Sequence, residues 1–186
     1  MLNEIENAAK VIKEGGVILY PTDTIWGLGC DPTNEIALKK IISIKQRDDS
    51  KQFIVLVANE QQLNKYVKEI PEISYELIDL ATNPLTIVYP TGQYVANGIL
   101  ADDKSIAIRL TTHEFCVKLM QKIKSGLVST SANISAKPSP KQFSDIDPEI
   151  LKAVDYVVNL EKNRISDKPS QIIKIGLKGE FQIIRK

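Results

Sequence analysis

The sequence predicts an α/β fold built on a mixed, twisted sheet, and three observations carry this prediction. Short apolar runs typical of buried strands alternate along the 186 residues with segments whose apolar residues recur at helical spacing. The alternation has no regular βαβ period, which argues against a doubly wound parallel sheet. Two strand-like runs flank residues 176–179, where paired glycines signal a hairpin. No linker-like stretch divides residues 1–186, so we expect a single domain.

The expected elements follow from the apolar periodicity. In chain order they are a helix over 5–12, a strand over 17–20, a helix from 35 that ends in 44–47, a strand over 53–57, helices over 60–66 and 72–81, strands over 85–89 and 105–110, a helix over 115–123, a strand over 127–130, a helix over 148–154, and strands over 156–159, 171–175 and 181–185. Residues 48–52 and 90–103 are expected as loops.

Capping and breaking residues predict where these elements end. Gly15 suits the C-terminal cap of the first helix, and Pro21 removes a ladder donor and ends the first strand. Asn34 and Asn59 can each cap the N-terminus of the helix that follows. Gly126 is expected to close the helix over 115–123.

Composition argues against several classes of function. Hydrophobic residues make up 43% and charged residues 25% of the chain, and the net charge is +1. That charge supplies no global field toward nucleic acid or membrane, although a local basic groove is compatible with it. Cys30 and Cys116 lack the spacing of a zinc site or a disulfide framework, and no apolar run is long enough to span a membrane. We therefore expect a cytoplasmic protein with no membrane contact and no resident metal.

Residues 15–32 organise the expected site. Two glycines and an apolar run lead to a proline, after which Thr22, Asp23 and Thr24 place three oxygen-bearing side chains where the strand ends. Two later glycines let the backbone approach a ligand or a neighbour closely. Taken alone, the pattern also describes a core strand followed by a turn.

A cationic segment ends the helix that Asn34 caps. Lys45 and Arg47, with Lys51 four residues further on, could clamp a polyphosphate, because arginine presents a planar fork and lysine a mobile point charge. The alternative is a solvated helix end, where cations also favour the C-terminal dipole.

A hydroxyl-rich segment, residues 129–139, follows an expected strand. It offers many donors to an anion, and its prolines lower the entropic cost of ordering a binding loop. The alternative is a polar loop with local capping bonds.

Arg109 is a lone cation in an otherwise apolar strand, where a charge needs a partner. A substrate carboxylate or a structural ion pair would serve. His113, the only histidine, follows two threonines at an expected helix start, which favours a surface role near the cap over catalysis. The sequence contains neither a G-x-S-x-G elbow nor a Walker A motif.

Together these segments resemble the YrdC-like family of threonylcarbamoyl-adenylate synthases. The matching pieces, in order, are residues 20–29 (YPTDTIWGLG), Lys45-Gln46-Arg47 with Lys51, residues 106–109 (IAIR) and residues 129–140 (STSANISAKPSP). Each piece is weak alone, but the ordered set covers nearly the whole chain. The resemblance implies a twisted α/β fold around a large, positively charged cavity, in a short single-domain form.

The resemblance also implies an activity and its partners. Family members form threonylcarbamoyl-AMP and pyrophosphate from L-threonine, bicarbonate and ATP, and we expect Mg²⁺ to be held mainly by ATP. The product serves the N6-threonylcarbamoyladenosine modification of tRNA. The expected partners are therefore a downstream threonylcarbamoyl transferase complex and, as a further contact, tRNA or double-stranded RNA. The expected enzyme class is nucleotidyltransferase.

By motif position, the family's site residues fall on named positions of this chain. Lys45 and Arg47 would be catalytic. ATP contacts would come from Arg47, Lys51, Ser105, Ser131, Asn133, Ser139 and Arg185. Threonine contacts would come from Thr24, Arg109, Ser129 and Ser170, with Arg109 near the carboxylate.

Two other classes of function stay open from the sequence. A basic cavity would also suit an RNA-binding module, and a paralogue of the same fold could lack this activity. The synthase reaction needs no protein nucleophile, which agrees with a site rich in lysine, arginine, serine and threonine. The lack of interleaved aromatic residues near Lys45 to Lys51 and the net charge of only +1 argue against the RNA-binding module. The Lys45-Gln46-Arg47 and Ser131-Ala132-Asn133 segments argue against the paralogue.

Overall fold

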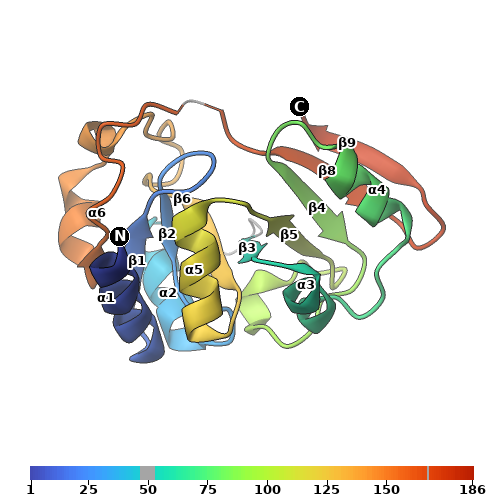
Figure 1. Ribbon diagram of the computed structural model, residues 1–186, viewed down its shortest axis with the longest axis horizontal. Coiled ribbons are helices and arrows are strands. Elements are labelled where there is room, and N and C mark those ends of the chain that lie inside the picture. The colour runs from blue at the N-terminus through green and yellow to red at the C-terminus, as the bar shows by residue number, and fades with distance from the viewer. Residues whose placement is uncertain (47–52, 167) are drawn as a thin grey trace.

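Nine strands form one mixed sheet in a computed structural model that describes residues 1–46, 53–166 and 168–186 (Figure 1). The strands are β1 (Ile18–Tyr20), β2 (Gly27–Gly29), β3 (Ile54–Val57), β4 (Leu85–Tyr89), β5 (Ile106–Leu110), β6 (Leu127–Ser131), β7 (Tyr156–Val157), β8 (Gln171–Ile175) and β9 (Phe181–Arg185). The helices are α1 (Leu2–Lys13), α2 (Glu35–Ile44), α3 (Glu60–Tyr66), α4 (Ile73–Leu80), α5 (Glu114–Ile123) and α6 (Pro148–Ala153), with short 3-10 helices at Asn97–Ile99 and Phe143–Asp145. The predicted mixed α/β fold is confirmed.

The strand order is β7-β1-β2-β6-β3-β5-β4-β8-β9. Strand β3 pairs in parallel with β5 and antiparallel with β6, while β4 pairs antiparallel with β5 and in parallel with β8. The predicted C-terminal hairpin is present as the antiparallel pair β8 and β9. The sheet is therefore mixed, as the irregular spacing of strands and helices predicts.

The pleat of the strands divides the apolar residues between the two faces of the sheet. In β3, Val55 and Val57 pack in the core that contains α2 and α3, whereas Leu56 packs in a second core with α1 and α5. Figure 1 shows α1 and α5 lying next to each other on their face. Successive side chains of β3 are thus buried on alternate faces of the sheet, as expected for a sheet with helices on both faces.

Three of the predicted caps are confirmed. Asn34 and Asn59 each have a side-chain oxygen that accepts a hydrogen bond, from the backbone N–H of Ala37 and of Gln62, both at 2.9 Å. Gly15 follows the end of α1 with φ 83°, a conformation that glycine adopts without steric cost. Among the described residues, no helix combines the length and hydropathy that a membrane span requires.

The structure corrects the sequence-based elements at three places. Gly27–Gly29, where the sequence predicts no strand, forms a strand between β1 and β6. The close backbone approach expected of these glycines is present, since a Cβ on Gly29 would lie 2.6 Å from the Tyr20 ring. Helix α5 is closed by Lys124, which takes a left-handed conformation, and not by Gly126. The strand expected over 156–159 is only Tyr156–Val157. The loop expected over 48–52 lies outside the described residues.

Candidate functional site

A cavity of about 470 Å³ opens on the face of the sheet that also carries α1 and α5. In β5, Ile106 and Ile108 point into the core on the opposite face, so the pleat turns Ala107 and Arg109 toward the cavity. Arg109 pairs across the sheet with Leu56, which packs against α5. The strand register therefore places a single cation of an apolar strand in the wall of the cavity.

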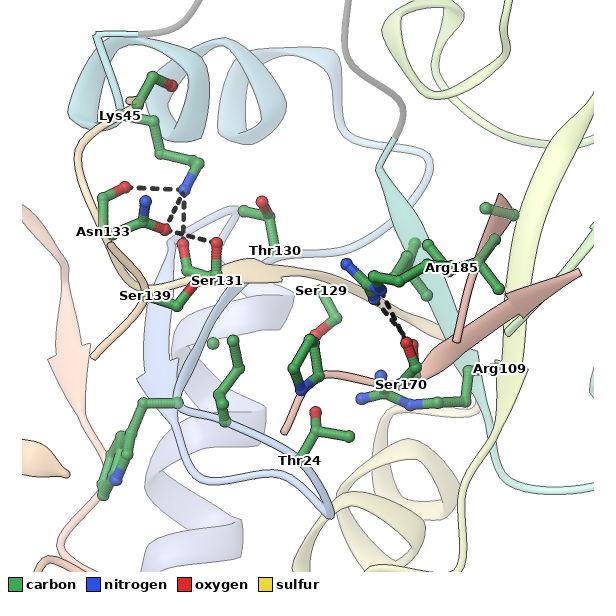
Figure 2. Close-up of a pocket in the computed structure, with 18 of the residues that line it drawn as sticks. Thr24, Lys45, Arg109, Ser129, Thr130, Ser131, Asn133, Ser139, Ser170 and Arg185 are labelled. Atoms are coloured by element: carbon green, nitrogen blue, oxygen red, sulfur yellow. Dashed lines mark hydrogen bonds between the residues drawn. The ribbon is translucent and has the colours of Figure 1, made fainter. Parts of the chain in front are cut away.

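The polar part of the cavity lining consists of cations, hydroxyl groups and one amide, and it lies beside apolar side chains such as Trp26 and Ile172. Lys45, Arg109, Lys137 and Arg185 contribute positive charge, and none of the described lining residues is acidic. Figure 2 shows two groups of side chains at separate ends: Lys45 with Ser131 and Asn133, and Arg109 with Ser170 and Arg185. A cavity of this composition suits a ligand with more than one negative group.

Lys45 ties the end of α2 to the segment after β6. Its side-chain ammonium donates to the carbonyl oxygens of Ser131 and Asn133 at 2.5 and 2.8 Å and contacts Asn133 Oδ1 at 3.3 Å. The residue is 3% exposed. Its backbone carbonyl accepts from the Ser135 N–H at 2.8 Å. Lys45 therefore fixes the first turn of the hydroxyl-rich segment in place.

Asn133 holds the rest of that segment. Its Oδ1 accepts from Ser131 Oγ at 2.5 Å, and its Nδ2 donates to the carbonyl oxygens of Ile134 and Lys137 at 3.0 and 2.6 Å. These bonds curl residues 131–137 around one amide, and the exposed Ser139 follows on the cavity rim. Both sequence-based alternatives for this segment are thus compatible with the structure: local capping bonds shape a loop that lines the cavity.

Arg109 has an ion-pair partner within the chain. Its Nη2 lies 3.0 Å from Asp23 Oδ1, and its side chain is 4% exposed against 16% for Asp23. Its Nε is buried without a hydrogen-bond partner among the described residues. The structural ion pair expected as one alternative is therefore present, and the Nε–H of the guanidinium is a buried donor whose partner the described residues do not supply.

Arg185 also lines the end of the cavity that contains Arg109. Its Nε donates to the Ser170 carbonyl at 2.8 Å and its Nη2 to Ser170 Oγ at 3.3 Å, while Ser170 Oγ lies 2.7 Å from Thr86 Oγ1. Burial, followed by the charge of Arg109, lowers the pKa of Arg185 from its ordinary value. Two guanidinium groups that repel each other across a cavity favour an anion between them.

Thr24 is positioned by its neighbour Thr22. The Thr22 hydroxyl donates to the Ile25 carbonyl at 2.8 Å, so in its 3.0 Å contact with Thr24 Oγ1 the donor is Thr24. The lone pairs of the Thr24 hydroxyl are then available to a donor in the cavity. Because Thr24 is only 5% exposed, a ligand that donates a hydrogen bond to this acceptor gains more binding free energy than it would from an exposed hydroxyl.

Most of the residues proposed from sequence gather in this cavity: Thr24, Lys45, Arg109, Ser129, Ser131, Asn133, Ser139, Ser170 and Arg185. Ser105 lies elsewhere: it is buried just before β5, and its N–H donates to Asp103 Oδ1. Arg47 and Lys51 lie outside the described residues. Asp23, present in the first motif, received no role from the sequence, although the need of Arg109 for a partner was a signal that could have found it.

The donor set does not form a metal cage. In the described part of the chain no cluster of three or more histidine, cysteine or carboxylate groups could hold a metal ion. The cationic and hydroxyl lining does not provide the carboxylate oxygens that Mg²⁺ prefers. A magnesium ion here would have to be held by an anionic ligand and water.

Comparison with known families gives one match over most of the chain. A family model named Sua5_yciO_yrdC, described as "Telomere recombination", matches residues 10–186. A threonylcarbamoyl-AMP synthase of Acinetobacter baumannii is 34% identical over 183 residues, covering 95% of both chains. Another, of Stenotrophomonas maltophilia, is 32% identical over 161 residues and covers 84% of this chain and 86% of its own.

Solved structures show the same fold. P. abyssi Sua5 complexed with L-threonine superposes with a TM-score of 0.84 at 31% identity over 92% of this chain and 50% of its own. This chain therefore spans about half the length of that Sua5 chain. E. coli YciO, at 21% identity, matches with a TM-score of 0.85 over 100% of this chain and 90% of its own, which supports the fold alone.

Proposed function

The chain belongs to the Sua5_yciO_yrdC family, and from that premise we propose that it is a threonylcarbamoyl-AMP synthase. The family resemblance read from the sequence is confirmed by this membership. One observation supports the proposal most strongly: the polar groups that line the cavity are cations, hydroxyls and an amide, without an acidic residue among those described, and they match the negative groups of ATP and of an amino acid. We place the reaction in the nucleotidyltransferase class.

The proposed reaction makes and breaks bonds without a protein nucleophile. The amine of L-threonine and bicarbonate give N-carboxy-threonine and water. The new carboxylate oxygen then attacks the α-phosphorus of ATP, forming a phosphorus–oxygen bond while the bond to the leaving pyrophosphate breaks. The protein's part is to hold the reactants in line and to stabilise the negative charge.

We assign the two ends of the cavity to the two larger substrates. The end with Lys45, Ser131 and Asn133 would hold the nucleotide, together with Ser139. The end with Arg109 would hold threonine, its carboxylate on the free Nε edge and its hydroxyl donating to Thr24. Ser129 on β6 lies between these ends, and Arg185, beside Ser170, would face the reacting phosphate. The assignment of Arg47, Lys51 and Ser105 to ATP stays a prediction.

Further parts of the proposal concern groups outside the protein. Mg²⁺ would enter with ATP, bound by phosphate oxygens and water, and would reduce the charge of the phosphates. The product would pass in the cytoplasm to a transferase complex that modifies tRNA. Direct contact with tRNA or double-stranded RNA is a separate proposal that a binding assay with each RNA would test.

We expect pyrophosphate release that requires ATP, L-threonine and bicarbonate together. The reason is that neither amine nor bicarbonate alone supplies the carboxylate that attacks phosphorus. The measurement is a coupled pyrophosphate assay in which each substrate is omitted in turn. Equal release without threonine would contradict the proposed function. Salt-sensitive RNA binding without pyrophosphate release would favour the RNA-binding module. The absence of both RNA binding and pyrophosphate release would favour an inactive paralogue.

We also expect serine to be a poor substrate and valine a worse one. Serine keeps the hydroxyl and loses one methyl group, worth about 1–3 kcal/mol, whereas valine leaves the buried Thr24 acceptor unpaired. The measurement is kcat/KM for the three amino acids on the wild type and on Thr24→Val. On Thr24→Val the preference for serine over valine should narrow, and valine rivalling serine on the wild type would refute this role of Thr24.

A further inference from the structure

A chain of polar contacts runs from Arg109 away from the cavity. Asp23 pairs with Arg109 and follows β1 in the segment that carries Thr24. The side chain of Arg164 holds the backbone of this segment from outside the cavity. The contacts thus join the amino-acid end of the cavity to a turn after β7, more than a hundred residues later in the sequence.

Arg164 donates hydrogen bonds to two consecutive carbonyl groups of the segment. Its Nη1 donates to the Thr22 carbonyl at 2.7 Å and its Nη2 to the Asp23 carbonyl at 3.1 Å. A planar guanidinium presents two parallel donors at a fixed spacing, which a lysine ammonium cannot reproduce. These bonds restrain the peptide that separates Thr22, which positions the Thr24 hydroxyl, from Asp23, which pairs with Arg109.

Glu161 and His113 hold Arg164 in turn. Glu161 Oε2 accepts from Arg164 Nη1 at 2.8 Å, and Glu161 Oε1 lies 2.9 Å from His113 Nε2. Burial would raise the pKa of Glu161, but its contacts with Arg164 and His113 outweigh burial and hold that pKa below its ordinary value. Glu161 also adopts φ 51°, uncommon for a residue with a Cβ, so its contacts maintain a turn that the backbone alone disfavours.

The side chain of His113 therefore has a different role from the surface role that the sequence predicted. It occupies the N-cap position of α5, as predicted, but its side chain makes no capping bond. The ring is 9% exposed and pairs with Glu161, so it is not a surface group. It links the start of α5 to the turn that carries Arg164.

We propose that Arg164 is a positioning residue for the amino-acid end of the cavity, acting through the Thr22 and Asp23 carbonyls on Thr24 and, through Asp23, on Arg109. Arg164 does not line the cavity, so it acts without touching substrate. This inference rests on the proposed function, because it assigns that end to threonine. Small displacements of groups that orient a reactant have large effects on rate and affinity.

The test compares Arg164→Ala and Arg164→Lys with the wild type in full-length protein. We measure KM for threonine and for ATP in the pyrophosphate assay, the Kd for threonine by calorimetry, and the melting temperature. We expect Arg164→Ala to raise KM and Kd for threonine about tenfold or more, with KM for ATP nearly unchanged. Arg164→Lys should recover only part of this loss. The matched control is Lys152→Ala, which removes an exposed cation of α6 that does not line the cavity.

A second variant protects the test from a folding artefact. Glu161→Gln leaves Arg164 in place and weakens the charge-assisted bonds of Glu161 to Arg164 and to His113, so a smaller rise in the same two threonine constants is expected. Equal threonine constants in Arg164→Ala and the wild type would overturn the inference and leave the proposed function intact. A parallel rise of both KM values would also overturn it, because the effect would then be general. Wild-type protein without threonine-dependent turnover would instead refute the proposed function itself.

Discussion

Lys45→Met should lower turnover about a hundredfold or more and destabilise the protein. The methionine keeps the length and apolar stem of the side chain but cannot donate to the carbonyls of Ser131 and Asn133. Each buried acceptor left without a donor costs about 1–3 kcal/mol, so we expect a loss of about 3 kcal/mol in the free energy of unfolding. The hydroxyl-rich segment would lose its anchor to α2, and KM for ATP should rise with it.

Denaturant unfolding and pyrophosphate release measure these two effects. Lys40→Met is the matched control, because Lys40 lies on the same helix and loses only a surface ion pair with Asp155, usually worth less than about 1 kcal/mol. The control should keep wild-type turnover. If Lys45→Met kept wild-type activity and stability, the anchor described for the segment after β6 would have no role in the site.

The sequence predicted those parts of the fold that depend on local chemistry. Asn34 and Asn59 cap helices because a short side-chain oxygen reaches an N–H three residues on, which is a contact within one turn. The apolar strands and the C-terminal hairpin follow from periodicity and paired glycines in the same way. The strand Gly27–Gly29 was not predicted because it depends on contacts with other segments of the chain, in which Gly29 packs closely against Tyr20 and Val128.

The residues of the candidate site fall into the same two groups, those that local sequence marks and those that depend on distant contacts. Motif order was enough to predict residues such as Thr24, Ser131 and Arg185, which the fold brings to one cavity. Contacts between distant segments were beyond the sequence. The Arg109–Asp23 pair spans 86 residues and the Arg164 bonds span more than 140. The sequence indicates that Arg109 needs a partner, but no local pattern identifies which residue it is or marks Arg164. Ser105 does not line this cavity, and its assignment to ATP by motif position stays a prediction.

Arg109→Lys should raise KM for threonine about a hundredfold and leave KM for ATP within a few-fold of the wild type. Lysine keeps a charge beside Asp23, so the buried carboxylate stays paired and the fold is preserved. It lacks the Nε edge of the guanidinium, and losing a charge-assisted contact to a carboxylate costs about 3 kcal/mol, which corresponds to about two powers of ten. Arg109→Ala should lose the same affinity and, in addition, about 3 kcal/mol of stability, because Asp23 is left as a nearly buried unpaired charge.

Steady-state kinetics with each substrate varied, together with thermal melting of both variants, separates these contributions. Lys174→Ala serves as the control for loss of a cation, because its ion pair with Asp103 is exposed and it does not line the cavity. It should leave both KM values and the melting temperature close to wild type. A wild-type KM for threonine in Arg109→Lys would show that the Nε edge does not bind the carboxylate. A rise confined to the KM for ATP would move Arg109 to the nucleotide end, and threonine would then have to be held by Thr24, Ser129 and Ser170 without a cation.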